Sequence, residues 1–343
     1  MLKTIFIGFF LLISLVSCGK RSIDPDMNQA SDRSLFAMDT YMTMRAYGDS
    51  GEEALEKAEE KINFLESILS VTAENSDLQR INNADGLPVT VSEETAKLID
   101  KAVGFCNKTD GTLDITLYSV LLEWGFTDSE FSIPDADSLA GSLECVDYSK
   151  VLVEGQTVTL PAGFKIDLGA LAKGYTSDTV IGILRENGVK SAIISLGGNV
   201  QTLGRKPDGS RWTIAVRDPF APESDMCVLE TEETAVVTSG NYERFFIGDD
   251  GKKYWHILDP SDGYPADNGL VSVTVIGESG LYCDALSTAL FVMGKERAVE
   301  FWRENKNFDM ILVTDSKKIF YTDSKAYEFE NLTEMPAEVV GDN

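Results

Sequence analysis

The sequence predicts a mixed α/β fold of the α+β class, because stretches with strand and helix periodicity follow one another without strict alternation. The 343 residues are enough for one large domain or two modest ones with a substantial core. No internal repeat is visible, and no linker divides the middle of the chain. We therefore expect one globular unit over residues 34–335 and a flexible tail over residues 336–343.

The first half of this unit contains one predicted strand and three predicted helices. Alternating side chains predict the strand over residues 36–47, and apolar residues at helical spacing predict a long amphipathic helix over 52–69. Ser76 and Ser92 are residues of the type that caps a helix N-terminus. They predict a short helix over 77–82 and a longer helix that ends near residue 109.

The second half contains two predicted hairpins, several single strands and two helices. Gly155 belongs to the turn of the first hairpin, and Gly188 is placed to end the first of these helices. In chain order we expect a hairpin over 151–160, a strand over 164–168, a helix over 176–187, strands over 191–196, 212–216 and 270–276, a helix over 280–293, and a hairpin over 310–322.

The N-terminus has the features of a lipoprotein signal. Lys3 supplies positive charge, residues 5–16 are almost entirely apolar but too few to cross a membrane, and Leu15-Val16-Ser17-Cys18 resembles a bacterial lipobox. We expect removal of residues 1–17, lipidation of Cys18 and a polar tether over residues 18–33. The mature protein would be held at the periplasmic face of a bacterial cell membrane. The alternative is an ordinary secretory signal with an incidental cysteine.

Charge and composition exclude several classes of partner and site. The net charge is -26 and no run is rich in Lys or Arg, so we do not expect nucleic-acid binding. The single histidine, His256, excludes multi-histidine zinc motifs such as HExxH. Cys106, Cys145, Cys227 and Cys283 are too far apart for a CxxC motif, and we expect most of them to be free thiols.

A glycine turn at the start of a helical pattern predicts a phosphate site. Residues 165–168 have strand character, Gly169 allows a turn, and a helical pattern that carries Lys173 follows. Backbone N–H groups at a helix N-terminus, with the positive end of the dipole behind them, bind phosphate. Asp167 could contact the ligand or help to place a metal. The alternative is an ordinary turn with a surface lysine.

A carboxylate and a hydroxyl four residues apart predict a cation site. Asp284 and Thr288 would lie on one face of the helix expected over 280–293, one turn apart. Such a pair could share Mg²⁺ or Ca²⁺, which prefer oxygen ligands, with backbone carbonyls of a nearby turn completing the shell. The alternative is a helix-capping aspartate and a threonine that faces the core.

His256 lies at the end of a short aromatic strand, before a turn rich in Pro and Gly. It could act as a general base, or stack on and hydrogen-bond an aromatic ligand. The alternative is a histidine without a function in a loop. The chain has no GxGxxG, Walker lysine loop or GxSxG elbow, which argues against a Rossmann dehydrogenase, a kinase and an α/β-hydrolase.

Taken together and in this order, the motifs of residues 36–293 resemble those of the ApbE family of FAD:protein FMN transferases. One departure is Asp39, at a position where many members have glycine. The motifs are Met38-Asp39-Thr40, Ser76-Asp77-Leu78 with Ile81-Asn82, Leu113-Asp114-Ile115-Thr116 with Trp124-Gly125-Phe126, the run from Lys165 to Gly174, Ser195-Leu196-Gly197-Gly198-Asn199, Thr238-Ser239-Gly240, His256-Ile257-Leu258-Asp259-Pro260 and Asp284-Ala285-Leu286-Ser287-Thr288.

The resemblance implies a T-fold-like core in a single unit of two lobes, and a set of ligand contacts. It implies one Mg²⁺ bound by Asp284, Thr288 and the backbone carbonyl of Ala170. Contacts with the substrate FAD are implied at Met38, Thr112, Leu113, Asp114, Asp167, Lys173 and Leu258.

The resemblance also implies the reaction, in which FMN moves from FAD to a threonine hydroxyl of a target protein and AMP is left. The implied targets are flavin-carrying subunits of Rnf-type and Na⁺-translocating NADH:quinone reductase complexes. Lys173 and Mg²⁺ would neutralise the diphosphate. His256 is our candidate for the base, with Asp284 and Asp167 as rivals. Two alternatives are a Mg²⁺-dependent FAD pyrophosphatase that yields FMN and AMP, and a non-catalytic flavin-binding lipoprotein.

Overall fold

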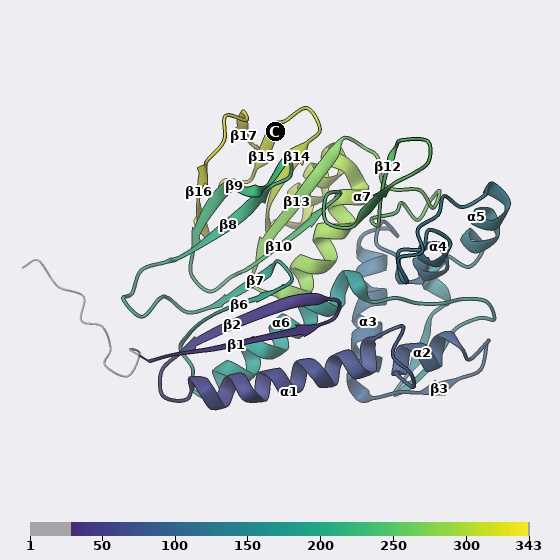
Figure 1. Cartoon of the computed structure of the whole chain (residues 1–343), viewed down its shortest axis with the longest axis horizontal. Coiled ribbons are helices and arrows are strands. Elements are labelled where there is room, and N and C mark those ends of the chain that lie inside the picture. Colours follow the sequence, from purple (N-terminus) through teal and green to yellow (C-terminus); the bar gives the residue numbers. More distant parts are fainter. Residues whose placement is uncertain (1–28, 342–343) are drawn as a thin grey trace, which may run out of the picture.

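The computed structural model describes residues 29–341, so the signal, Cys18 and most of the predicted tether lie outside the described residues. The mixed α/β class is confirmed, with a nine-stranded sheet at its centre (Figure 1). Its strand pairs are antiparallel except for the last, which is parallel. In spatial order the strands are β1 (Ala30–Ala37), β2 (Thr40–Tyr47), β6 (Ser191–Leu196), β7 (Asn199–Leu203), β10 (Ala235–Gly240), β13 (Leu270–Gly277), β14 (Asp309–Thr314), β15 (Ile319–Tyr321) and β17 (Ala337–Val339).

Helices cover one face of this sheet and a smaller sheet covers part of the other. Side chains of a strand alternate between faces, and on β10 Val237 packs with the helices while Val236 packs with the smaller sheet. The three helices are α1 (Gly51–Leu69), α6 (Gly169–Glu186) and α7 (Gly280–Asn305). The smaller sheet has the order β16 (Tyr327–Asn331), β9 (Ala221–Thr231) and β8 (Trp212–Asp218).

A second lobe lies to one side of the large sheet, as Figure 1 shows for its four helices. One hydrophobic cluster runs from the layer of α7 into this lobe, so the two lobes share a core. Its helices are α2 (Asp77–Asn82), α3 (Glu93–Lys108), α4 (Tyr118–Glu123) and α5 (Ala136–Leu143), and it contains the sheet of β3 (Val89–Thr90), β5 (Thr157–Thr159) and β4 (Leu152–Glu154). The hairpin of β11 (Phe245–Ile247) and β12 (Lys253–Trp255) packs beside α4.

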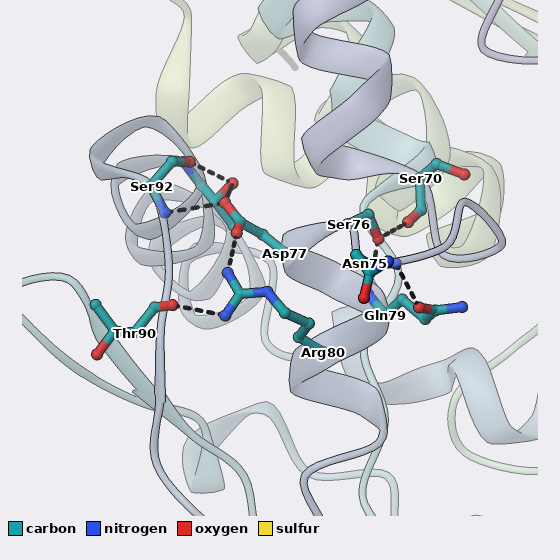
Figure 2. Close-up of polar contacts among 9 residues, drawn as sticks. Ser70, Asn75, Ser76, Asp77, Gln79, Arg80, Thr90 and Ser92 are labelled. Atoms are coloured by element: carbon teal, nitrogen blue, oxygen red, sulfur yellow. Dashed lines mark hydrogen bonds and ion pairs between the residues drawn. The ribbon is translucent and has the colours of Figure 1, made fainter.

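The two serine caps predicted from the sequence are confirmed, and a polar network surrounds them (Figure 2). The Ser76 hydroxyl accepts the N–H of Gln79 at 3.0 Å. The buried Asp77 carboxylate accepts the Ser92 N–H at 2.9 Å and also pairs with Arg80. Asp77 therefore connects the start of α2 to the start of α3. The Ser76-Asp77-Leu78 motif thus has a structural role.

The predicted first strand is wrong as a single element, because residues 36–47 contain a hairpin turn between β1 and β2. Ala37 pairs with Thr40, which leaves Met38 and Asp39 as a two-residue turn with φ of +51° and +57°. Hairpin turns of this kind require left-handed residues and favour Gly or Asn there. No glycine marks the turn, and the alternation continues across it. Residues 30–33, expected in the tether, belong to β1.

The predicted strand over 164–168 is also wrong. The side chain of Asn82, at the end of α2, satisfies both backbone groups of Ile166, accepting its N–H at 2.8 Å and donating to its carbonyl at 2.9 Å. An amide side chain thus takes the place of a neighbouring strand. The following helix, α6, begins at Gly169 rather than at residue 176, so Lys173 lies within its first two turns.

Two corrections concern the C-terminal part. The helix expected to end at residue 293 continues to Asn305, with a break at Gly294, where φ is +75°. The tail predicted to be flexible from residue 336 contains β17, which pairs with β15. The other predicted helices, strands and hairpins are confirmed within a few residues of their ends. None of the helices between residues 29 and 341 combines the length and apolar character that a membrane span needs.

Candidate active site

Helices α6 and α7 cross at two glycines, and this contact brings Asp284 onto α6. A Cβ atom on Gly174 would lie 2.3 Å from the Gly280 carbonyl oxygen and 2.6 Å from the Asp284 Cβ, so only glycine fits. The Gly174 N–H donates to the Asp284 carboxylate at 2.8 Å. In an α-helix this N–H is directed at the carbonyl four residues earlier, that of Ala170. The carboxylate therefore lies at the point of α6 where the predicted carbonyl ligand is found.

Thr288 follows one turn later on α7 and faces the end of β10. Its hydroxyl lies 3.4 Å from the Ser239 hydroxyl, which also bonds the Ser287 hydroxyl at 2.7 Å. Ser239 belongs to the Thr238-Ser239-Gly240 motif, so β10 and α7 contribute hydroxyl groups to one place. The predicted one-turn spacing of Asp284 and Thr288 is confirmed by the helix.

The Asp284 carboxyl is buried, with a residue exposure of 4%, and it lacks a formal ion pair among the described residues. Burial raises its pKa, while the charge of Lys173, the Gly174 N–H and the side chain of Asn199 oppose this. The Asn199 side chain lies beside this carboxylate, but its buried Nδ2 atom forms no hydrogen bond of ordinary geometry within the described part of the chain. A buried acid beside an unpaired donor indicates a place where a ligand or ion completes the contacts.

A second acid, Asp178, fixes the start of α7. Its carboxylate accepts two backbone N–H groups at the helix N-terminus, those of Gly280 at 2.6 Å and Leu281 at 3.1 Å, and the Ser279 hydroxyl at 2.7 Å. A carboxylate at this end of a helix is favoured by the dipole. Asp178 thus sets the position of the helix that carries Asp284.

The segment before α6 places Asp167 beside the second lobe. Its carboxylate accepts the Gly169 N–H at 2.8 Å, and its own N–H donates to the Ile115 carbonyl at 2.9 Å. Burial raises the pKa of Asp167, whereas the charges of Arg244 and Lys173 act to lower it. Asp167 and Lys173 are therefore on the same side of the start of α6.

His256 follows β12 and is held by the main chain of Arg244. The Arg244 carbonyl accepts the backbone N–H of His256 and lies 3.1 Å from its Nδ1. Since a carbonyl can only accept, Nδ1 carries the proton and Nε2 is left as an acceptor. Burial lowers the pKa of His256 to about 4, with the charges of Arg244 and Lys173 acting in the same direction. The imidazole is neutral at physiological pH.

The structure brings four predicted site residues into one electrostatic neighbourhood. The charge of Lys173 acts on Asp167, His256 and Asp284. The Met38 turn adjoins this group, because the Thr176 hydroxyl of α6 lies 3.6 Å from the Met38 sulfur. Four chain segments far apart in sequence therefore meet around the start of α6.

The other residues that were predicted to contact FAD are buried or already hydrogen-bonded within the chain. The side chains of Leu113 and Leu258 are buried in hydrophobic clusters, and the Thr112 hydroxyl donates to the Thr109 carbonyl at 2.9 Å. Asp114 caps a 3₁₀ turn through Thr116 at 2.8 Å. Leu258 lies two residues after His256, and residues 112–114 precede Ile115, whose carbonyl accepts the Asp167 N–H. A role for these four residues in FAD contact stays a prediction.

Residues 29–341 contain no group of three or more His, Cys, Asp or Glu side chains that could hold a metal. A cation at Asp284 would therefore need hydroxyl or carbonyl oxygens as well, which is the donor set that the sequence predicted. The four cysteines of this part are free thiols, as expected. A cavity of about 1160 Å³ between α3 and the start of α7 includes none of the predicted site residues.

Sequence reasoning missed Arg244. Its relation to His256 follows from the pairing of β11 with β12, in which Phe245 is opposite Trp255. The signal was present, since two short aromatic stretches flank a turn at residues 248–252, but the two had not been paired.

Comparison with known proteins identifies the family. Residues 38–312 match the ApbE family. A FAD:protein FMN transferase of Klebsiella pneumoniae (strain 342) is 35% identical over 311 residues, covering 89% of this chain and 96% of that protein. The chain belongs to the ApbE family. The chain is accordingly an enzyme of the transferase class. A protein of the same name from Treponema pallidum (strain Nichols) is 30% identical over 331 residues and covers 90% of each chain.

Solved ApbE structures share the fold. The crystal structure of the ApbE protein from Thermotoga maritima matches with a TM-score of 0.80 and 34% identity, covering 85% of this chain and 96% of that one. The apo form of the flavinyl transferase ApbE from Pseudomonas stutzeri gives a TM-score of 0.76 at 26% identity, covering 90% and 96%. These likenesses confirm the ApbE-type fold expected from the sequence.

Proposed function

We propose that this ApbE protein transfers the FMN moiety of FAD to a threonine hydroxyl of an acceptor protein, in a Mg²⁺-dependent reaction that releases AMP. The observation that carries the proposal is the buried Asp284 carboxylate on the Gly174 N–H, at the start of a helix that also presents Lys173. The names of the Klebsiella and Treponema relatives support FAD and FMN as the flavins.

The donor set fits a hard cation. Asp284 offers a buried carboxylate oxygen, Thr288 a hydroxyl one turn on, and Ala170 a backbone carbonyl at the same level of α6. These are oxygen ligands, which Mg²⁺ prefers over nitrogen or sulfur. When bound, Mg²⁺ would supply electrostatic stabilisation of charge on the diphosphate.

The diphosphate of FAD would lie at the N-terminal end of α6. There the positive end of the helix dipole favours anions. The Gly169 N–H already donates to the Asp167 carboxylate, and the Leu171 and Ala172 N–H groups donate to the Leu168 carbonyl. Lys173 is half-buried and forms no ion pair within residues 29–341, its Nζ bonding only the Gly169 carbonyl at 3.4 Å. Its charge is available to the phosphates and to the AMP that leaves.

His256 is the best-placed base. The threonine oxygen attacks the phosphorus of the FMN half, the bond from that phosphorus to the bridging oxygen breaks, and AMP leaves with the bridging oxygen. The threonine proton passes to Nε2, the acceptor left by the Nδ1 contact with the Arg244 carbonyl. Asp167 and Asp284 remain rivals, but the metal and the α6 N-terminus would stabilise their carboxylates, which makes them weaker proton acceptors.

Incubation with FAD, Mg²⁺ and an acceptor protein tests the proposal. We expect flavin fluorescence that stays with the acceptor after denaturation, a mass increase equal to one FMN group on a threonine, and one AMP per transfer. Free FMN without labelled acceptor would instead identify a pyrophosphatase, and intact FAD after long incubation would identify a flavin-binding protein without this chemistry.

The cellular setting is part of the proposal. Cys18 in a lipobox supports lipidation and a place on the periplasmic face of a bacterial membrane. Flavin-carrying subunits of Rnf-type or Na⁺-translocating NADH:quinone reductase complexes are the proposed acceptors, on the strength of the family resemblance.

A further inference from the structure

We infer that Arg244 is a catalytic residue whose guanidinium binds the diphosphate of FAD while its carbonyl positions His256. The inference rests on the proposed function, since it names a further contact of the same site. It starts from the contacts of Arg244, which lies at the start of the β11–β12 hairpin.

One end of the guanidinium is fixed. Its Nη2 donates to the Phe126 carbonyl at 2.6 Å, in the Trp124-Gly125-Phe126 motif. The side chain is otherwise exposed, and within the described chain it forms no ion pair, unlike its neighbour Arg217, which pairs with Glu243 at 3.4 Å. The Arg244 guanidinium therefore has N–H donors left for a ligand. Arginine binds phosphate through two parallel hydrogen bonds more readily than lysine does.

The charge of the fixed guanidinium acts on the site. It acts on both His256 and Asp167, and Lys173 acts on the same two groups from α6. Two cations thus act on one half-buried region, in which Asp167 is the carboxylate that both of them influence, and Lys173 also acts on the buried Asp284. In a chain with a net charge of -26, such a local excess of positive charge is the arrangement expected where an anionic ligand binds.

The main chain of Arg244 gives the residue its second role. The same carbonyl accepts the His256 N–H and holds its Nδ1. Arg244 would therefore fix both the bound phosphate, through its guanidinium, and the His256 imidazole that carries Nε2, through its carbonyl. A purely structural alternative is that Arg244 only ties the hairpin to Phe126.

Binding without turnover separates the two roles. FAD and riboflavin are titrated in EDTA, by flavin fluorescence, into the wild type and the Arg244→Gln, Arg244→Lys and Arg217→Gln variants. We expect Arg244→Gln to weaken FAD binding about 10- to 100-fold, the scale of a charged hydrogen bond, and to leave riboflavin binding unchanged. Arg244→Lys should fall between, and Arg217→Gln should match the wild type.

Three outcomes would overturn the inference or the function. Unchanged FAD affinity in Arg244→Gln, or equal losses for FAD and riboflavin, refutes a phosphate contact. A wild type that binds FAD neither in EDTA nor with Mg²⁺ added refutes the proposed function itself. The pH profile of kcat/KM adds a second readout: removal of the cation should move the acid limb upward in Arg244→Gln, because the pKa of His256 is no longer held down by that charge, but not in Arg244→Lys.

Discussion

At the scale of single residues, burial opposes the charge of Asp284, and within residues 29–341 no arginine or lysine contacts its carboxylate directly. We expect Asp284→Asn to lower kcat/KM for FMN transfer at least ~100-fold, since the carboxylate's share of the metal site is worth several kcal/mol. The amide oxygen can still accept the Gly174 N–H. Transfer assays with varied Mg²⁺ measure the loss, and Asp249→Asn, on an exposed turn, is the matched control.

Thermal unfolding shows whether Asp284 acts through the metal. Because the pKa of Asp284 is raised in the folded state, its ionised form at neutral pH costs stability when no cation is present. Metal-free Asp284→Asn should thus unfold at or above the wild-type temperature. Mg²⁺ should raise the Tm of the wild type and not of the variant. A full Mg²⁺ response in the variant would remove Asp284 from the site.

His256 gives a pH prediction. Its pKa is lowered to about 4 in the folded protein, whereas an unperturbed histidine titrates near pH 6.5. The neutral imidazole is therefore retained as pH falls through 6.5 and lost only near 4. We expect kcat/KM, which reports the free enzyme, to be flat between pH 7 and about 5 and to fall below that. An inflection near pH 6.5 would contradict this environment.

The chemistry of the site could be predicted from single residues, but not all of its geometry. Asp284 with Thr288, Asp167 with Lys173, and His256 were each found as local patterns. Asn199 was noticed only as part of a glycine-rich turn, and Arg244 not at all. The roles of Asn199 and Arg244 depend on which segments pair or cross in space, and local sequence patterns do not show this.

At the scale of elements, the crossing of α6 and α7 decides whether the site exists. Gly174→Ala would force the helices apart, because its Cβ would meet the Gly280 carbonyl at 2.3 Å. We expect a loss of about 1–3 kcal/mol in the free energy of unfolding, the usual cost of overpacking, together with loss of transfer. Denaturant unfolding and the transfer assay measure the two effects.

Gly182 of the same helix is the control for this crossing. A Cβ there would meet nothing within 4 Å. Gly182→Ala should stabilise the protein by about 0.5–1 kcal/mol through helix propensity alone and leave transfer unchanged. If both alanines behave alike, the close approach of α6 and α7 is not what holds Asp284 in place.

Elements with strong periodicity or a cap were predicted well, and those held by tertiary contacts were not. The helices after Ser76 and Ser92 carry their own start signals. The segment at 164–168 has strand composition, yet its backbone partner is the side chain of Asn82. The turn at Met38 lacks glycine, so only the pairing of β1 with β2 and the packing on α6 reveal it.

At the scale of the whole molecule, the charge and the helices bear on how the enzyme reaches a membrane. A net charge of -26 opposes adsorption to anionic lipid surfaces, which attract basic segments. No helix within residues 29–341 is suited to span a bilayer. Membrane attachment, if it occurs, therefore depends on the segment that contains Cys18.

The Cys18→Ser variant tests this dependence. We expect the wild type to fractionate with membranes and the variant to be released, whatever the salt concentration, because no electrostatic contact is involved. The stretch from Cys18 to Ala30 spans at most about 40 Å when fully extended, so an enzyme anchored at Cys18 would work close to the surface. The wild type should then modify an acceptor embedded in vesicles faster than the variant does, while both modify a soluble acceptor domain equally. Equal rates on both acceptors would show that the anchor does not select the target.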